Sequence, residues 1–145
     1  MNVGFTGTRE GMTDAQKLTF RVAIIEPVED PGKLDFHYGC CVGADTDAAR
    51  IVYHRGYRRI VGHPPNCDVN LSETALGFNT ENHDPLPYLA RNKRIVDACD
   101  VLVACPKGPE EQRSGTWSTV RYARKQKKRI IIIWPDGRMA QENDS

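Results

Sequence analysis

The sequence contains no apolar stretch that approaches the ~20 residues needed to cross a membrane. Its N-terminal residues, MNVGFTGTRE, lack the basic segment and the long apolar run of a secretory signal peptide. We therefore expect a cytoplasmic protein with no membrane partner. The net charge at pH 7 is only +1, so no overall field attracts nucleic acid, and we predict that nucleic acid is not a partner.

The sequence also lacks the patterns of a metal or redox site. Its five cysteines are odd in number and none forms a C-x-x-C pair, which favours free structural thiols. The four histidines are scattered, and none is paired at the i, i+4 spacing that places two ligands on one helix face. The sequence therefore predicts no metal site and no cofactor.

Five short apolar runs alternate with four segments of helical periodicity. The expected strands are residues 2–7, 34–38, 58–63, 101–105 and 129–134. The first helix begins at a capping box, with Thr13 as N-cap and Gln16 three residues later, and ends before Pro27. Its buried face is expected to contain Ala15, Leu18, Val22 and Ile25. The other helices are expected between residues 44 and 56, over 88–99 and over 114–126.

This order of elements predicts an α/β fold. Continuous apolar strands that alternate with amphipathic helices form parallel sheets covered on both faces. Right-handed crossovers then favour a three-layer, Rossmann-like domain with a five-stranded, mostly parallel sheet in the order 3-2-1-4-5. We expect a single domain over residues 1–137, followed by a flexible tail over residues 138–145.

The predicted order places a switch point between the first and fourth strands, where open α/β sheets bind ligands outside the carboxyl ends of their strands. Three segments rich in glycine and small residues meet there: 7–9 (GTR), 39–45 (GCCVGAD) and 106–117, which ends in SGTW. The long polar segment 64–87 is expected to close over the ligand, because loops of this length are usually functional or disordered.

The segment RSGTWSTVRYARK, residues 113–125, has the composition of an anion-binding helix start. The first N–H groups of a helix have no partner within it and carry a partial positive charge. Gly115 has no Cβ that would hold an anion away, and Ser114 and Thr116 offer hydroxyl donors. Three arginines are expected to reach the same edge of the sheet: Arg9, Arg91 and Arg113. We therefore predict a phosphate site here.

Each of these signals also has a purely structural interpretation. Ser114 can serve only as an N-cap, and Gly7 and Gly43 can serve only tight turns. Trp117 can stack on a base or lie in the core. The basic run 124–129 is interpreted as a solvated helix end, with a nucleic-acid patch as the alternative. The convergence of three loops at one edge, and no single motif, favours ligand binding.

Four motifs together resemble the SLOG superfamily, in particular its small stand-alone bacterial and phage members. They are GFTGTR at 4–9, GCCVGAD at 39–45, YLARNKRIVDACDVLVACP at 88–106 and RSGTWSTVRYA at 113–123. The resemblance extends over most of residues 2–137. It implies a Rossmann-like fold that binds nucleotides or nucleotide-derived ligands, and a homo-oligomer. Its relatives include "lonely guy" phosphoribohydrolases, molybdenum-cofactor carriers and the DNA-processing protein of natural transformation.

The phosphoribohydrolases of this superfamily carry a P-G-G-x-G-T-x-x-E signature, whose glycines bind phosphate and whose glutamate assists loss of the base. The resemblance aligns Gly115-Thr116 with the G-T pair and Arg91 with an arginine on the preceding helix. The glutamate position is occupied by Thr119, which supplies no carboxylate for cleavage of an N-glycosidic bond. The weak catalytic candidates that remain are Glu110 and Glu111. Asp45 is a third, for which a ribose-hydroxyl or N-cap role is favoured.

We therefore predict a protein that binds a nucleotide, or a cyclic or ADP-ribose-type signal, as a sensor, carrier or sequestering protein. The predicted ligand-binding residues are Gly7, Thr8, Arg9, Gly43, Ala44, Asp45, Arg91, Asn92, Arg113, Ser114, Gly115, Thr116 and Trp117. Among them, Thr8, Gly43 and Asp45 are expected to hold ribose or a second phosphate. The alternatives are a nucleotide N-ribohydrolase that uses Glu110 or Glu111 and a nucleic-acid-binding protein.

Overall fold

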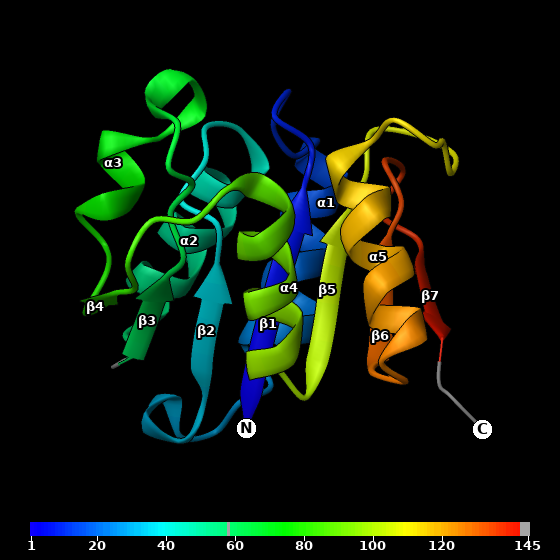
Figure 1. Cartoon of the computed structure of the whole chain (residues 1–145). Coiled ribbons are helices and arrows are strands. Elements are labelled where there is room, and N and C mark those ends of the chain that lie inside the picture. Colours follow the sequence, from blue (N-terminus) through cyan, green and yellow to red (C-terminus); the bar gives the residue numbers. More distant parts are fainter. Residues whose placement is uncertain (58, 143–145) are drawn as a thin grey trace.

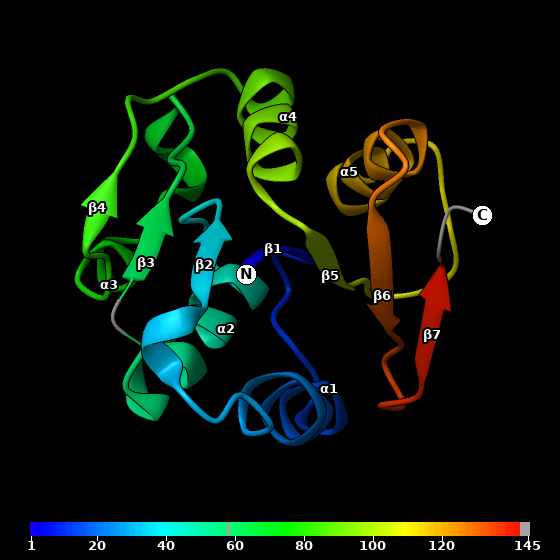
Figure 2. The ribbon, with the colours of Figure 1, turned by 90° about the horizontal axis from the view of Figure 1, so that it is seen from below.

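The computed structural model describes residues 1–57 and 59–142, which form one sheet with helices on both faces (Figures 1 and 2). The strands are β1 (Asn2–Gly7), β2 (Asp35–Tyr38), β3 (Arg59–Gly62), β4 (Glu81–Asn82), β5 (Val101–Cys105), β6 (Arg129–Ile133) and β7 (Met139–Glu142). The α-helices are α1 (Asp14–Thr19), α2 (Ala44–Arg55), α3 (Glu73–Leu76), α4 (Tyr88–Ala98) and α5 (Gly115–Lys125). A π-helix, η1 (Phe20–Ile25), continues α1, and two 3₁₀ turns are η2 (Pro31–Lys33) and η3 (Asp68–Asn70). Within the described ranges, no helix has the length and apolar character needed to span a membrane.

The sheet has the order β4-β3-β2-β1-β5-β6-β7. Its central strands, β3-β2-β1-β5-β6, all pair in parallel, and this confirms the predicted 3-2-1-4-5 order. The predicted count of five strands was too low, because β4 adds a parallel edge beside β3 and β7 adds an antiparallel edge beside β6. Figure 2 shows α1 and α2 on one face of the sheet and α4 and α5 on the other, which gives the expected three layers.

The edge strand β7 corrects the prediction of a flexible tail over residues 138–145. Met139–Glu142 pair with Ile130–Ile133 of β6. A tight turn directs this return: the Trp134 N–H donates to the carbonyl of Arg138 (2.9 Å), and Gly137 has φ +90°, a conformation that favours glycine. Because β7 is short and alternates exposed with half-buried residues, it offers no apolar run for sequence reasoning to detect. Residues 143–145 lie outside the described ranges.

The first helix begins at the predicted capping box and then changes its pitch. The chain continues as the π-helix η1, which takes more residues per turn than an α-helix. The buried side chains therefore follow spacings of four and five residues: Gln16, Phe20 and Ile25. Leu18 and Val22, which were expected on the buried face, are 55% and 49% exposed.

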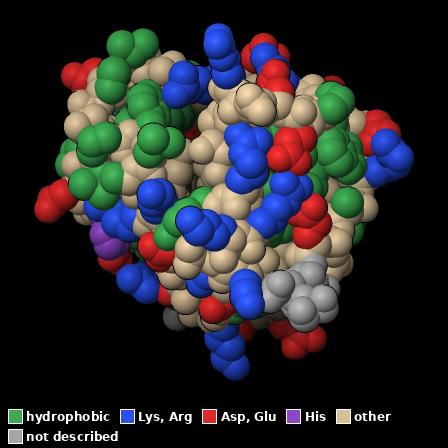
Figure 3. All heavy atoms as spheres, turned by 45° about the vertical axis from the view of Figure 1, so that its right-hand side comes forward, with side chains coloured by type: hydrophobic (Ala, Val, Ile, Leu, Met, Phe, Trp, Pro, Cys, Tyr) green, Lys and Arg blue, Asp and Glu red, His purple; other side chains and the backbone are tan. Residues whose placement is uncertain are grey.

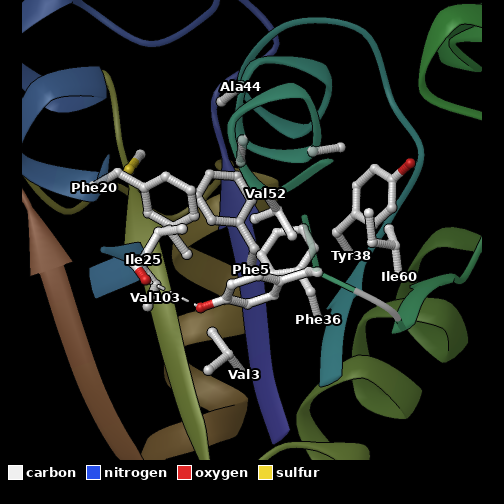
Figure 4. Packing of buried hydrophobic residues seen from close by; sticks show 14 of the residues in the cluster. Val3, Phe5, Phe20, Ile25, Phe36, Tyr38, Ala44, Val52, Ile60 and Val103 are labelled. Carbon is white, nitrogen blue, oxygen red and sulfur yellow. Dashed lines mark hydrogen bonds between the residues drawn. The ribbon is translucent and has the colours of Figure 1, made fainter. Parts of the chain in front are cut away.

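The larger core cluster lies between the sheet and the layer that contains α1 and α2 (Figure 4). Phe5, Phe20, Phe36 and Tyr38 form its centre, where neighbouring ring centroids lie 5.5 to 6.3 Å apart, a separation typical of favourable aromatic pairs. A second cluster packs between α5 and the opposite face of the sheet. The two clusters pack against opposite faces of the central strands, whose carboxyl ends form one edge of the sheet.

Residues 64–87 contain more structure than the irregular loop that was expected. They include η3, α3 and β4, and they pack beside β3 (Figure 1). Ser72 caps α3 by accepting a hydrogen bond from the Ala75 N–H (3.0 Å). The hydroxyl of Tyr38 donates to the Ala75 carbonyl (2.9 Å), which ties α3 to β2.

Candidate ligand-binding site

A cavity of about 480 Å³ opens at the carboxyl ends of β1, β2 and β5, at the predicted switch point. Most of the predicted ligand-binding residues line it: Gly7, Thr8, Arg9, Asp45, Arg91, Asn92, Arg113, Ser114, Gly115 and Thr116. The structure therefore brings all three glycine-bearing segments to one cavity. Tyr88 and Lys107 also line it, although sequence reasoning did not select them.

Gly43 and Ala44 do not line the cavity, because they join the start of α2 to the loop after β1. The Ala44 N–H donates to the carbonyl of Thr8 (2.9 Å). Gly43 has φ +87°, and a Cβ at this position would overlap the backbone of Arg9. Gly7 also allows the loop after β1 to lie close to the start of α2, since a Cβ at Gly7 would lie 2.5 Å from the Ala44 Cβ. The start of α2 thus packs against the protein's own loop after β1. Gly43 and Ala44 are therefore structural, which corrects their assignment as ligand-binding residues.

The start of α5 keeps the donors that the sequence predicted. Ser114 is the N-cap, and its hydroxyl oxygen accepts from the Trp117 N–H (3.2 Å), while its carbonyl accepts from the Ser118 N–H (2.9 Å). The N–H groups of Gly115 and Thr116 come before the first intrahelical bond, and both residues line the cavity. A Cβ at Gly115 would meet no heavy atom within 4 Å, so this backbone is open to a ligand.

Trp117 belongs to the core and not to the site. It is 2% exposed, and its ring packs against Trp134 with the centroids 5.7 Å apart. Each residue of an α-helix is rotated by about 100° from the one before it, so the side chain after Thr116 turns from the cavity toward the sheet. The assignment of Trp117 as a ligand-binding residue was therefore wrong.

Arg91 and Arg9 approach the cavity in different ways. Arg91 is 6% exposed, and its guanidinium donates to the carbonyls of Gly39 (2.5 Å) and His63 (3.3 Å), which ties α4 to the ends of β2 and β3. Arg9 is exposed and lies over the ring of Tyr88, with its guanidinium carbon 4.9 Å from the ring centroid. Among the residues that the structure describes, Arg9 has no ion-pair partner, so its guanidinium can turn to an anion.

Asp45 places a buried carboxyl group in the wall of the cavity. The residue is 7% exposed, and its Oδ2 accepts from the Cys41 N–H (3.1 Å). Gly39 makes room for this arrangement, since a Cβ there would overlap the Arg91 guanidinium and lie 2.9 Å from Asp45 Oδ2. Burial raises the pKa of Asp45 to about 6, although the charge of Arg91 and the N–H groups of Cys41 and Gly39 act in the opposite sense. Asp45 is therefore mostly ionised at pH 7.

The candidate catalytic carboxylates lie apart. Glu110 does not line the cavity and instead pairs with Arg124 (2.9 Å) and Arg121 (3.2 Å) of α5. Its hydrogen bonds with these arginines lower the pKa of Glu110, so it does not hold a proton for acid catalysis near neutral pH. Glu111 lines the cavity and is exposed. Thr119 is buried, and its hydroxyl donates to the Gly115 carbonyl (2.9 Å).

None of residues 64–87 lines the cavity, so this segment does not close over it as was expected. Its link to the site is indirect. The side-chain amide of Asn70 donates to the hydroxyl of Tyr88 (3.1 Å), and Tyr88 supports Arg9. Tyr88, an aromatic residue that lines the cavity, is thus the first residue of α4, and no glycine or basic motif marks it in the sequence.

A buried polar chain beneath α4 also escaped sequence reasoning. Arg94 Nε lies 3.0 Å from His63 Nδ1, His63 Nε2 lies 3.0 Å from His37 Nδ1, and His37 Nε2 lies 3.0 Å from the side-chain oxygen of Asn2. Burial lowers the pKa of His63 to about 3 and also lowers the pKa of His37. Arg94 comes from α4, His63 follows β3, and His37 and Asn2 come from β2 and β1, so their distance in sequence hid the cluster. The part of the chain that the structure describes has no His, Cys, Asp or Glu cluster placed to hold a metal ion.

Several solved structures share this fold. The molybdenum cofactor binding protein from the phototrophic bacterium Rippkaea orientalis has a TM-score of 0.68 at 22% identity, with 92% of this chain and 76% of that chain covered. The structural genomics target TM1055 has a TM-score of 0.62 at 15% identity, with 89% and 71% covered. DNA processing protein A from Helicobacter pylori has a TM-score of 0.61 at 16% identity, and this chain, 91% covered, spans 64% of its length. Neither a protein-family model nor a curated protein matches the sequence.

At these identities the similarity shows the fold alone. Two of the structures are of kinds that the SLOG resemblance named, a molybdenum-cofactor protein and a DNA-processing protein, and the Rossmann-like fold that the resemblance implied is confirmed. The Helicobacter protein binds single-stranded DNA, and this finding corrects the prediction that excluded nucleic acid. Net charge averages over a whole surface, whereas binding depends on local groups. Figure 3 shows one face on which many Lys and Arg side chains lie among Asp and Glu.

Proposed function

We propose that the cavity binds a small nucleotide or a nucleotide-derived signal of the cyclic or ADP-ribose type, and that the chain acts as a cytoplasmic sensor, carrier or sequestering protein. The observation that carries this proposal is the start of α5. The backbone N–H groups of Gly115 and Thr116 are free of intrahelical partners and belong to a cavity that Arg9 and Arg113 also line. Free N–H groups at a helix start are a recurrent binding site for phosphate.

Most of the affinity for a phosphate is expected from the arginines of the cavity, and less from the dipole of α5. A helix dipole contributes about 0.3–1 kcal/mol to an exposed charge, whereas a hydrogen bond to a charged group contributes about 1.5–3 kcal/mol. Arg9 can move from Tyr88 to a phosphate at a cost of about 0.5–1 kcal/mol, the value of an exposed cation–π contact. The cavity volume of about 480 Å³ is within the range typical of small-molecule sites.

The positions of the carboxylates favour binding over hydrolysis. The residue aligned with the catalytic glutamate of the phosphoribohydrolases is Thr119, whose hydroxyl is bonded within α5. Glu110 is paired with arginines outside the cavity. Glu111 therefore remains as the candidate for an N-ribohydrolase, which is the alternative that the test must exclude.

The test is thermal unfolding of the whole chain with AMP, GMP, CMP, UMP, cyclic AMP and ADP-ribose. A nucleotide at 100 times its Kd adds about 2.7 kcal/mol to the unfolding free energy, or roughly 10 °C for a chain of this size. Arg9→Ala and Gly115→Asp should each abolish this gain while the melting temperature without ligand stays nearly unchanged. Both positions are open, so neither substitution disturbs packing. Gly108→Asp is the matched control, because a Cβ at Gly108 also meets no heavy atom within 4 Å but Gly108 does not line the cavity, so this variant should keep the gain.

Two results would contradict the proposal. If both charge-altering variants still gain stability with a nucleotide, the ligand does not bind at the start of α5. If free base accumulates during incubation and Glu111→Gln stops it, the chain is an N-ribohydrolase. Chromatography of the same samples measures the base.

A second candidate is the binding of single-stranded nucleic acid, which the fold shared with DNA processing protein A favours. Affinity for an oligonucleotide should then fall steeply with salt, because phosphate contacts release counterions. Loss of that affinity in Arg9→Ala would place the strand at the same cavity.

A further inference from the structure

The strongest unexplained feature of the cavity is the carboxyl group of Asp45. Among the residues that the structure describes, no cation forms an ion pair with it, although it is 7% exposed. Its Oδ2 accepts from the Cys41 N–H, and the Gly39 N–H also acts on this carboxylate, so the donors to it in the same ranges are backbone N–H groups. Asp45 also lines the cavity, so its carboxyl group belongs to the wall that a ligand would meet.

Arg91, the nearest guanidinium on α4, does not neutralise this carboxylate directly. Its Nη1 donates to the carbonyls of Gly39 and His63, and its Nε donates to the side-chain oxygen of Asn92 (2.8 Å). A buried carboxylate without an ion-pair partner is costly unless a hydrogen-bond donor approaches it. Backbone N–H groups already approach Asp45 from the protein side, so a further donor can reach this carboxylate from the cavity, where a ligand supplies it.

The cavity thus makes two opposite demands on one ligand. The start of α5 and the arginines Arg9 and Arg113 require a negative group. Asp45 repels a negative group and requires an N–H or O–H donor. In a nucleotide, the phosphate meets the first demand and the sugar hydroxyls meet the second.

We propose that Asp45 is a specificity-determining residue that accepts a hydrogen bond from a sugar hydroxyl, so that the cavity selects ribonucleotides over 2′,3′-dideoxynucleotides. This inference rests on the proposed nucleotide site and names the class of sugar it takes. A site built to hydrogen-bond a hydroxyl rejects the analogue that lacks it, because the buried acceptor is then left without a partner. The expected discrimination is roughly 10- to 100-fold in Kd.

The test is titration calorimetry of the whole chain with AMP, GMP, CMP and UMP and with their 2′,3′-dideoxy counterparts. The wild type should bind the tightest ribonucleotide roughly 10- to 100-fold more strongly than its dideoxy form. Asp45→Ala should bring this ratio close to 1. Asp45→Asn keeps an acceptor for the Cys41 N–H and should fold where alanine fails, and its ratio should lie between the two. The 2′-deoxy and 3′-deoxy monophosphates then show which hydroxyl Asp45 contacts.

The outcomes separate the two proposals. Ribonucleotides and dideoxynucleotides that bind the wild type equally well overturn the role of Asp45 and leave the nucleotide site standing. A ratio that stays high in both Asp45 variants also overturns it, because the discrimination then arises elsewhere. Absence of binding by all eight nucleotides overturns the sugar selection, and if cyclic AMP and ADP-ribose also fail to stabilise the chain, the nucleotide site is overturned with it.

Discussion

Replacing Gln16 with leucine should destabilise the protein far more than its place in the short helix α1 suggests. The side chain is 1% exposed. Its Nε2 donates to the carbonyls of Pro106 and Ile133, both at 2.9 Å, and its Oε1 accepts from the Thr13 N–H (3.0 Å). One amide therefore joins the first helix to the carboxyl ends of β5 and β6, next to the cavity.

The magnitude follows from those three bonds. Leucine has a similar volume, so the change leaves no large cavity, but it removes both donors. Each buried carbonyl that loses its donor costs about 1–3 kcal/mol, and loss of half of the capping box costs about 0.5–1 kcal/mol. The unfolding free energy should fall by about 2.5–7 kcal/mol, a large part of the 5–15 kcal/mol typical of a domain.

Gln16→Glu tests the same contacts by charge. An ionised carboxylate still accepts from Thr13 but faces two carbonyl oxygens as a negative group, so the loss at pH 7 should exceed that of leucine. Burial and the two carbonyls raise the folded pKa of such a glutamate above its ordinary value. Its protonated form can donate one hydrogen bond, so stability should recover as the pH falls toward 4.

Urea unfolding followed by circular dichroism measures these free energies. Leu18→Gln is the matched control, because Leu18 lies two residues away and is 55% exposed, and it should change stability by less than about 0.5 kcal/mol. If Gln16→Leu is as stable as this control, the buried amide does not hold the edge of the sheet and the reasoning fails.

Two further predictions concern pH and backbone conformation. Between pH 7 and pH 5, the wild type should lose about 2 kcal/mol of stability relative to a His63→Gln variant. The folded pKa of His63 is about 3, well below its ordinary 6.5, so the unfolded chain takes up a proton that the folded chain excludes. Asp45, whose folded pKa is raised, acts in the opposite sense but equally in both proteins, and parallel pH profiles in urea unfolding would contradict this assignment. Gly43→Ala should cost at least about 2 kcal/mol, because φ is +87° and the Cβ would overlap the neighbouring backbone, whereas Gly115→Ala should cost almost nothing. Equal melting temperatures for the two alanine variants would show that the strain at Gly43 is absent.

The central sheet could be predicted because its strands are continuous apolar runs and the rules of parallel connection leave few orders. The same rules place the loops after β1, β2 and β5 together, so the edge that carries the site followed from the sequence. The edge strands could not be predicted in this way. β4 has two residues and β7 alternates exposed with half-buried side chains, and both owe their pairing to neighbours that the rest of the fold provides.

The errors within the site have a common physical origin. A glycine or small residue near a ligand site signals a close approach, but the sequence does not say what approaches. Gly43 and Ala44 are approached by the backbone of the loop after β1. No heavy atom of the protein lies within 4 Å of the Cβ position at Gly115. Trp117 was misplaced because its direction depends on where α5 begins. Tyr88 gave no motif, since its role comes from the fold around it.

The hydrogen bonds of the polar chain beneath α4 all run in one donor-to-acceptor direction. A guanidinium can only donate, so Arg94 obliges His63 to receive at Nδ1 and to carry its hydrogen on Nε2. His37 must then adopt the same tautomer: its Nδ1 accepts from His63, and its Nε2–H donates to the side-chain oxygen of Asn2, at the beginning of β1. No single hydrogen bond in this chain can exchange its donor and acceptor unless the others change as well. These hydrogen bonds therefore connect α4, which lines the cavity, to the beginning of β1. A displacement of either element should change the position of the other.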